Sequence, residues 1–246
     1  MEIYLTKMIL NPNSRRVWDD LGNLQNMHRT VSKAFPKIEP DKTVPHHLQK
    51  TPRNEFNLLH RLDFDSRNGK AVLFVQSGIA PDWSFLQADY AVRIECKTVH
   101  EQYSNIANGM RLLFRLQANP TKRIGKSDGK ADERFKPSDE RKIRRRVELR
   151  TDEEKIGWLK RKGEEAGFRL TDARIKEAVE NAHVHSSSKQ FGRRGRNDKK
   201  MTFGAVVFEG VLQVTDAEKF RESLKTGIGT GKAYGFGLMS IAKSPN

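Results

Sequence analysis

The feature that most constrains the fold is an order of apolar patterns that occurs twice along the chain. Each half reads as strand, helix, strand, strand, helix and strand, because period-2 alternation and 3.6-residue spacing follow one another in that order. This β-α-β-β-α-β order is that of the ferredoxin-like unit. The sequence therefore predicts an α+β fold of two tandem ferredoxin-like domains, at 1–100 and 110–246, joined near 101–109.

The first half begins with a strand over 1–10 that places Ile3, Leu5 and Ile9 on one face. Helical spacing follows, and Gly22-Asn23 is expected to divide it into two helices. The rest of the unit is expected as two strands around a turn, a short helix and a closing strand, at 56–64, 70–77, 82–89 and 90–99.

The second half opens with a strand at 110–120. Two Thr-x-x-Glu capping boxes then predict helix starts, at Thr151 and at Thr215. Gly227 is a natural stop for the second helix, and strands are expected at 203–214 and 236–242. Residues 174–189 are ambiguous, because their first half favours helix whereas the repeat requires a strand. The charged stretch 121–150 is interpreted as an insertion.

Charge narrows the class of partner. The formal net charge is +15 over 246 residues, which favours a polyanion, with nucleic acid ahead of an anionic membrane surface. The chain has one cysteine, which argues against a disulfide framework or a cysteine zinc site. No apolar run approaches about 18 residues, and the N-terminus lacks the pattern of a signal peptide. A cytoplasmic protein is expected.

The stretch GIGTGKAYGFG at 227–237 contains five glycines and a Gly-Lys pair. It is not a P-loop, because its spacing is one residue short, Ala233 stands where the Mg²⁺-binding hydroxyl belongs, and it follows a helix rather than a strand. Exposed backbone N–H groups around Lys232 would suit a phosphodiester backbone. A tight helix-to-strand junction is the alternative interpretation.

Two basic runs are candidates for RNA contact. Residues 189–200 hold six basic residues and one acid, and we expect them to form a protruding hairpin that enters the deep major groove of A-form RNA at the base of a stem. Phe191, within this run, would stack on a base or pack internally. The second run, 141–150, lies inside the insertion.

Five stretches together resemble a known family. GIGTGKAYGFGL, FRLQANPTK, VVFEGVL, NMHRTVSKAF and EKIGWLKRK are similar to the CRISPR-associated repeat endoribonucleases of the CasE type, in the family's order, from Met1 to Ala242. The resemblance implies two ferredoxin-like domains that bind a repeat hairpin and cut at its 3′ base by 2′-hydroxyl attack. It implies no metal and no cofactor, and further subunits of a type I-E surveillance complex as partners.

The resemblance implies His28 as the base, whose pKa class suits this task, and Lys33 as the group that stabilises phosphorane charge or protonates the 5′-oxygen. The two are five residues apart and do not share a helix face, but they could converge if His28 lies at the helix start and the long Lys33 side chain bends back. Some relatives carry a tyrosine where Gln25 stands here, and Tyr4 is a speculative substitute. The expected RNA-contacting residues are Arg29, Ser32, Lys122, Arg123, Arg193, Arg194, Arg196, Lys199, Lys200, Gly229, Gly231 and Lys232.

Two functions of different classes remain open at this point. One is a metal-independent endoribonuclease that leaves a 2′,3′-cyclic phosphate and a 5′-hydroxyl and retains its product. The other is a non-catalytic RNA-binding assembly module. Metal sites look poor, because His46-His47 and His183-x-His185 lack acidic or cysteine partners at ligand spacing.

Overall fold

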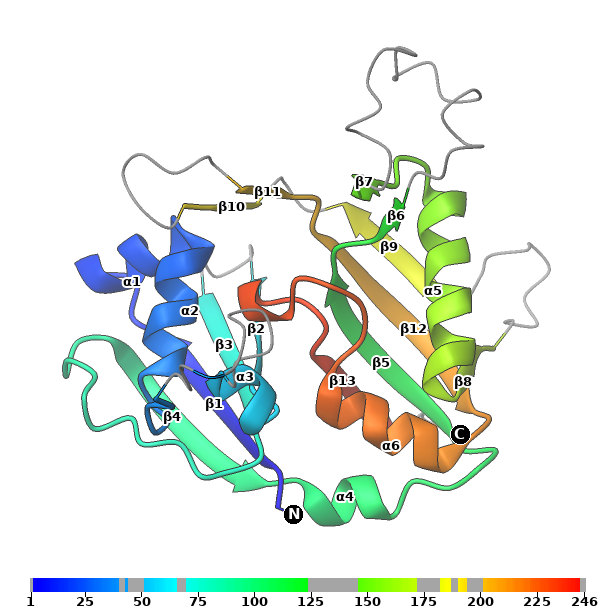
Figure 1. Ribbon diagram of the computed structural model, residues 1–246, viewed down its shortest axis with the longest axis horizontal. Coiled ribbons are helices and arrows are strands. Elements are labelled where there is room, and N and C mark those ends of the chain that lie inside the picture. Colours follow the sequence, from blue (N-terminus) through cyan, green and yellow to red (C-terminus); the bar gives the residue numbers. More distant parts are fainter. Residues whose placement is uncertain are drawn as a thin grey trace.

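A computed structural model describes residues 2–39, 43, 51–65, 70–123, 146–171, 182–186, 190–193 and 201–243 (Figure 1). Its two main sheets are antiparallel, one with four strands and one with five, and helices partly cover each of them. Both sheets have the strand order of a ferredoxin-like unit, so the predicted fold class is confirmed. The four strands of the first sheet lie between Tyr4 and Thr98 and those of the second between Arg111 and Lys243, whereas the domain bounds 1–100 and 110–246 stay a prediction.

The first sheet has the order β2-β3-β1-β4. Its strands are β1 (Tyr4–Leu10), β2 (Leu59–Asp65), β3 (Lys70–Ser77) and β4 (Ala91–Thr98). Helices α1 (Arg15–Leu21) and α2 (Leu24–Ser32) follow β1, and α3 (Pro52–Glu55) precedes β2. The predicted break at Gly22-Asn23 is confirmed, since Gly22 ends α1 and Asn23 caps α2.

Ile3 and Leu5 share one face, as predicted, and both belong with the core of the second half, whereas Met8 and Leu10 face the core beneath the helices. Both faces of β1 are apolar, so alternation alone could not show which core each face meets. One expectation for this half is wrong, because the expected helix at 82–89 is a series of turns. There Asp82 accepts from the Ser84 N–H at 2.9 Å, a local bond that competes with helix.

The second sheet has the order β13-β5-β12-β8, and β9 also pairs with β12. Its elements are β5 (Arg111–Ala118), α5 (Asp152–Ala166), β8 (Phe168–Leu170), β9 (Ala182–Ser186), β12 (Val206–Val214), α6 (Ala217–Thr226) and β13 (Met239–Lys243). The second strand of the unit is thus divided between β8 and β9. The strand required within 174–189 is β9, and the helix favoured for the first half of that stretch lies outside the described residues.

The remaining elements connect or extend these sheets. Helix α4 (His100–Ser104) lies between the two halves. Strands β6 (Thr121–Arg123) and β7 (Arg146–Glu148) pair at the ends of the insertion, and β10 (Gln190–Gly192) pairs with β11 (Met201–Phe203). The β10–β11 pair confirms a hairpin in the predicted basic segment. A 3₁₀ turn, η4 (Lys232–Tyr234), interrupts the glycine-rich stretch.

The helix ends follow capping chemistry. The predicted box at Thr151 is present, with Thr151 accepting from the Glu154 N–H and Glu154 accepting in return. The second prediction is shifted by one residue, because Asp216 rather than Thr215 caps α6 by accepting from the Lys219 N–H. Gly167 ends α5 in a left-handed conformation, and Phe168 then begins β8.

Polar side chains of the first sheet fasten the two halves together. Buried Arg61 of β2 donates to the carbonyl oxygens of Arg115 and Leu238 at 3.1 and 3.0 Å. Buried Gln76 of β3 donates to the carbonyl oxygen of Leu224 in α6 at 2.8 Å. These bonds fix the relative position of the sheets and thus of any site between them. Within the described residues, no helix is both long enough and apolar enough to span a membrane.

Candidate RNA-binding and cleavage site

Helix α2 positions the candidate base. His28 is the fifth residue of this nine-residue helix and is half-buried. Its ring centroid lies 6.2 Å from that of Tyr234 in η4, with the planes tilted by 56°. The helix of the first half therefore meets the glycine-rich stretch of the second half at His28.

The N-terminus of α2 is also tied to the basic hairpin. The Asn23 side-chain oxygen accepts from the Gln25 N–H at 3.1 Å, which caps the helix, and from the Arg193 N–H at 3.0 Å. The Asn23 amide donates to the Arg193 carbonyl oxygen at 3.1 Å. One side chain thus holds together the start of α2 and the end of β10, across 170 residues of sequence.

Lys33 lies at the other end of α2 from Asn23. It is the C-cap residue and is exposed. His28 is not at the helix start, so the condition set for the two side chains to converge is not met by the helix geometry. The pairing of His28 with Lys33 stays a prediction, and the described ring contact of His28 is instead with Tyr234.

The glycine-rich stretch is a closed loop between α6 and β13. Its five glycines all have φ between 79° and 92°, a region that favours glycine. The Ile228 N–H donates to the Gly237 carbonyl oxygen at 2.9 Å, and the Gly237 N–H donates to the Gln117 carbonyl oxygen at 2.8 Å. The loop is therefore anchored to β5 and presents η4 between the two halves (Figure 1).

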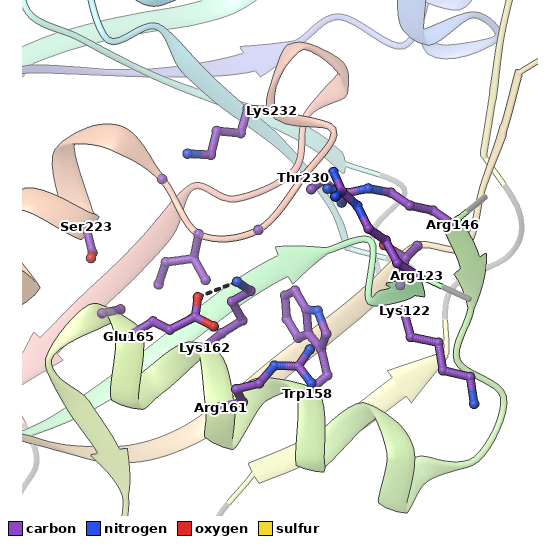
Figure 2. Close-up of a pocket in the computed structure, with 15 residues that line it drawn as sticks. Lys122, Arg123, Arg146, Trp158, Arg161, Lys162, Glu165, Ser223, Thr230 and Lys232 are labelled. Atoms are coloured by element: carbon purple, nitrogen blue, oxygen red, sulfur yellow. Dashed lines mark hydrogen bonds and ion pairs between the residues drawn. The ribbon is translucent and has the colours of Figure 1, made fainter. Parts of the chain in front are cut away.

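One side of this loop forms a basic pocket of about 540 Å³ with α5, β6 and β7 (Figure 2). Arg123 and Arg146 point toward Thr230 of the loop. Trp158 contributes an aromatic wall, and Lys162 forms an ion pair with Glu165. Its basic lining residues are Lys122, Arg123, Arg146, Arg161, Lys162 and Lys232. Such a concentration of cations suits a run of phosphates.

Lys232 is held at the edge of this pocket. Its ammonium donates to the Thr226 carbonyl oxygen at 2.7 Å. Desolvation lowers the pKa of Lys232 below its usual value, and the charges of Arg53 and Lys162 lower it further. An approaching phosphate would relieve this repulsion, so the electrostatics of the pocket favour an anion.

The other side of the loop forms a second pocket of about 340 Å³, which we call the aromatic pocket. Phe191, Tyr234 and Met27 form its apolar walls, and His60 and Gln190 contribute polar atoms. Burial, and to a lesser extent the charge of nearby His28, lowers the pKa of His60 to about 3. His60 is therefore neutral at physiological pH.

The predicted RNA-contacting residues fall into four groups. Lys122, Arg123, Gly229 and Lys232 line the basic pocket together, whereas Arg29 and Ser32 lie on α2, with Arg29 exposed and Ser32 half-buried. Arg193 follows β10, and Gly231 is the residue before η4. The remaining four lie outside the described residues: Arg194, Arg196, Lys199 and Lys200.

Sequence reasoning missed several lining residues. Arg161 and Lys162 were visible in EKIGWLKRK as charges on a capped helix, but nothing in the sequence showed that this helix faces the glycine-rich stretch. Tyr234 and His60 carried no distinguishing signal. The suggested substitute Tyr4 donates to Glu2, a hydrogen bond that raises its pKa. In the described residues there is no group of three or more His, Cys, Asp or Glu side chains placed to hold a metal ion.

The fold and the two pockets define a tandem ferredoxin-like protein in which a basic pocket lies near His28 of α2. The family model described as CRISPR associated protein matches residues 3–243. The CRISPR-associated endoribonuclease Cse3 of Thermus thermophilus is 35% identical over 243 residues, which is 98% of this chain and 100% of that protein. The chain belongs to the CRISPR associated protein family.

A second relative and a solved structure agree. The CRISPR system Cascade subunit CasE of Escherichia coli is 31% identical over 242 residues, covering 98% of this chain and 99% of that protein. A structure of Thermus thermophilus Cse3 bound to an RNA that represents a pre-cleavage complex has a TM-score of 0.73 and 34% identity. That match covers 98% of this chain and 100% of that one. The resemblance inferred from the sequence motifs is thereby confirmed.

Proposed function

We propose that this protein is a metal-independent endoribonuclease that binds the hairpin of a CRISPR repeat and cleaves precursor CRISPR RNA at the 3′ base of the stem. The observation that carries the proposal is the meeting of His28 with η4. Lys232 of that turn lines the basic pocket, while Tyr234 two residues later contacts the His28 ring. An RNA backbone bound in the basic pocket would therefore pass close to His28.

The chemistry needs a base, a charge and a proton donor. His28 takes the proton from the 2′-hydroxyl, and the 2′-oxygen attacks the adjacent phosphorus as the bond to the 5′-oxygen breaks. The 5′-oxygen receives a proton, so the products are a 2′,3′-cyclic phosphate and a 5′-hydroxyl. Lys33 is proposed to stabilise the phosphorane charge or to supply that proton. No metal ion or cofactor takes part in these steps.

Partners follow from the same reasoning. The basic pocket and the basic hairpin bind the RNA stem, and the product stays bound after cleavage. We propose that the protein then works in the cytoplasm as a subunit of a type I-E surveillance complex; the name of the Escherichia coli relative makes that protein a subunit of the CRISPR system Cascade.

The deciding experiment incubates the pure protein with a labelled repeat hairpin in excess EDTA, beside a copy with 2′-deoxyribose at the cut position. One cut at the 3′ base, absent from the deoxy copy, would support the proposal. Tight binding without a cut would favour a non-catalytic RNA-binding module, with Gln25 as the first residue to examine.

Two sets of variants divide catalysis from binding. His28→Ala should abolish cleavage with little change in RNA affinity, because one neutral side chain adds little to phosphate binding. Replacing Arg193, Arg194 and Arg196 together should weaken binding and flatten its dependence on salt, since fewer counterions are released. An unchanged salt slope would place the RNA elsewhere.

A further inference from the structure

The aromatic pocket has walls from both halves of the chain. Leu24 and Met27 of α2 and Leu62 of β2 come from the first half, and Phe191 and Tyr234 come from the second. Phe191 is 39% exposed, which is unusual for a large apolar side chain. The pocket is therefore open to solvent beside the Phe191 ring, and apolar side chains form much of its wall.

Polar atoms without partners lie at the same pocket. Within the described residues, His60 Nε2 and Gln190 Oε1 are buried and take part in no hydrogen bond. His60 is only 2% exposed, and a polar atom that is buried without a partner destabilises the folded protein. A third lining residue is Asp20, whose Oδ1 lies 3.4 Å from the Arg16 guanidinium and accepts no hydrogen bond from a described residue, while its Oδ2 accepts from the Tyr90 hydroxyl at 2.9 Å.

Aromatic walls with a few convergent polar atoms are typical of a site for a flat, heteroaromatic ligand. The volume of about 340 Å³ is also within the range of small-molecule pockets. Proteins that read single-stranded RNA stack splayed bases on aromatic side chains and hydrogen-bond their edges. The lining of this pocket offers both kinds of contact.

Its position sets which base can enter. Tyr234 lines the pocket and its ring lies 6.2 Å from that of His28, and His28 is the group proposed to act at the scissile phosphate. A base in the pocket therefore belongs to a nucleotide close in sequence to that phosphate.

We infer that the aromatic pocket binds one unpaired nucleobase of the RNA, turned out of the stack within two nucleotides of the scissile phosphate. The base stacks on Phe191 and its edge meets Gln190 and His60. Because the unpartnered oxygen of Gln190 is an acceptor, a base with an exocyclic amine fits best. This inference rests on the proposed endoribonuclease function and names a subsite of it.

The test removes one base at a time. Hairpins carry an abasic ribose at each of the two nucleotides on either side of the cut, with every 2′-hydroxyl retained, and affinity is measured on the His28→Ala protein. One position should lose about tenfold in affinity, since stacking of one base contributes 1–3 kcal/mol. Equal affinity at all four positions would overturn the inference.

A variant then shows whether that base sits in this pocket. Phe191→Ala should lose about tenfold in affinity for the intact hairpin, and for this variant the abasic substitution should cause no further loss. Phe85→Ala, which removes an aromatic side chain of 40% exposure outside both pockets, is the matched control and should respond as the parent does. If the abasic substitution lowers the affinity of Phe191→Ala by the same factor as it lowers that of the parent, the base is bound elsewhere and the inference fails.

The polar contact is tested by replacing the same base with purine, which lacks exocyclic groups. Gln190→Met, which keeps the length of the side chain, should lose the preference for the amine-bearing base. These outcomes are separate from the proposed function. If one base affects binding but the hairpin is never cut, the endonuclease proposal is wrong and the base-binding pocket stands. If the hairpin is cut but none of the four bases affects binding, the endonuclease proposal stands and the pocket inference is wrong.

Discussion

Arg61 is the residue whose loss should most clearly separate the two halves of the chain. It is 1% exposed. Besides the carbonyl oxygens of Arg115 and Leu238, it donates to both carboxylate oxygens of Asp63 at 2.8 and 3.0 Å and to Ser240 at 2.9 Å. Arg61→Met keeps an unbranched side chain but leaves the carboxylate and the carbonyl oxygens without this donor.

The magnitude follows from what is left buried. Removing one partner of a buried ion pair costs about 3–5 kcal/mol. The Asp63 side chain is 20% exposed and keeps Arg115 at 3.5 Å, so water and the second cation offset part of the loss. We expect the free energy of unfolding to fall by about 3 kcal/mol, measured by urea denaturation.

Arg93→Met is the matched control for Arg61→Met. Arg93 also pairs with an acid two residues along its strand, Glu95, but its side chain is 67% exposed. Exposed pairs contribute about 0–1 kcal/mol, so this variant should unfold close to the parent. Equal losses in the two variants, or a loss below about 1 kcal/mol for Arg61→Met, would refute the view that this network holds the halves together.

Three further outcomes are expected. Because the pKa of His60 is about 3 in the folded protein, only the unfolded state binds a proton at this residue as the pH falls below about 6.5. The free energy of unfolding should therefore fall by about 2 kcal/mol between pH 7 and pH 5. A His60→Phe variant that shows the same fall would contradict this. Asn23→Asp keeps the acceptor of the helix cap but loses the amide donor to Arg193, so amide exchange in β10 and β11 should accelerate while α2 stays protected; equal acceleration in both would mean that the cap itself was lost. Gly227→Ala should destabilise by about 1–3 kcal/mol in urea, since φ is 81° and a Cβ would meet Leu59 at 2.8 Å, whereas Gly157→Ala, with open space around it, should be neutral or slightly stabilising.

Much of the fold was predictable because it is written in local patterns. Alternation at 110–120 and the cap at Thr151 located strand and helix correctly, and the repeat required the strand that became β9. Which core each face of β1 meets was not predictable, because Leu5 and Met8 are both apolar and the docking of the second half decides the outcome. The helix expected at 82–89 failed because Asp82 forms a local turn.

The candidate site was predictable only in part. The family resemblance predicted Lys122 and Arg123, and the glycine-rich motif predicted Lys232; all three line one pocket. The contact of Tyr234 with His28, however, joins residues about 200 positions apart, and no local pattern encodes such a distance. The clamp at Asn23 has the same character, since a helix cap is visible in the sequence whereas a second partner on a distant strand is not.

The turn η4 serves as the common boundary of the two pockets, and this arrangement affects how the site can change. Lys232 lines one pocket and Tyr234 the other. Substituting either side chain alters one pocket alone. Affinity for the RNA backbone and specificity for a base can therefore evolve independently. Inserting or deleting a residue between Gly231 and Gly235 would instead alter both at once, and we therefore expect the length of this turn to tolerate far less variation than its side chains.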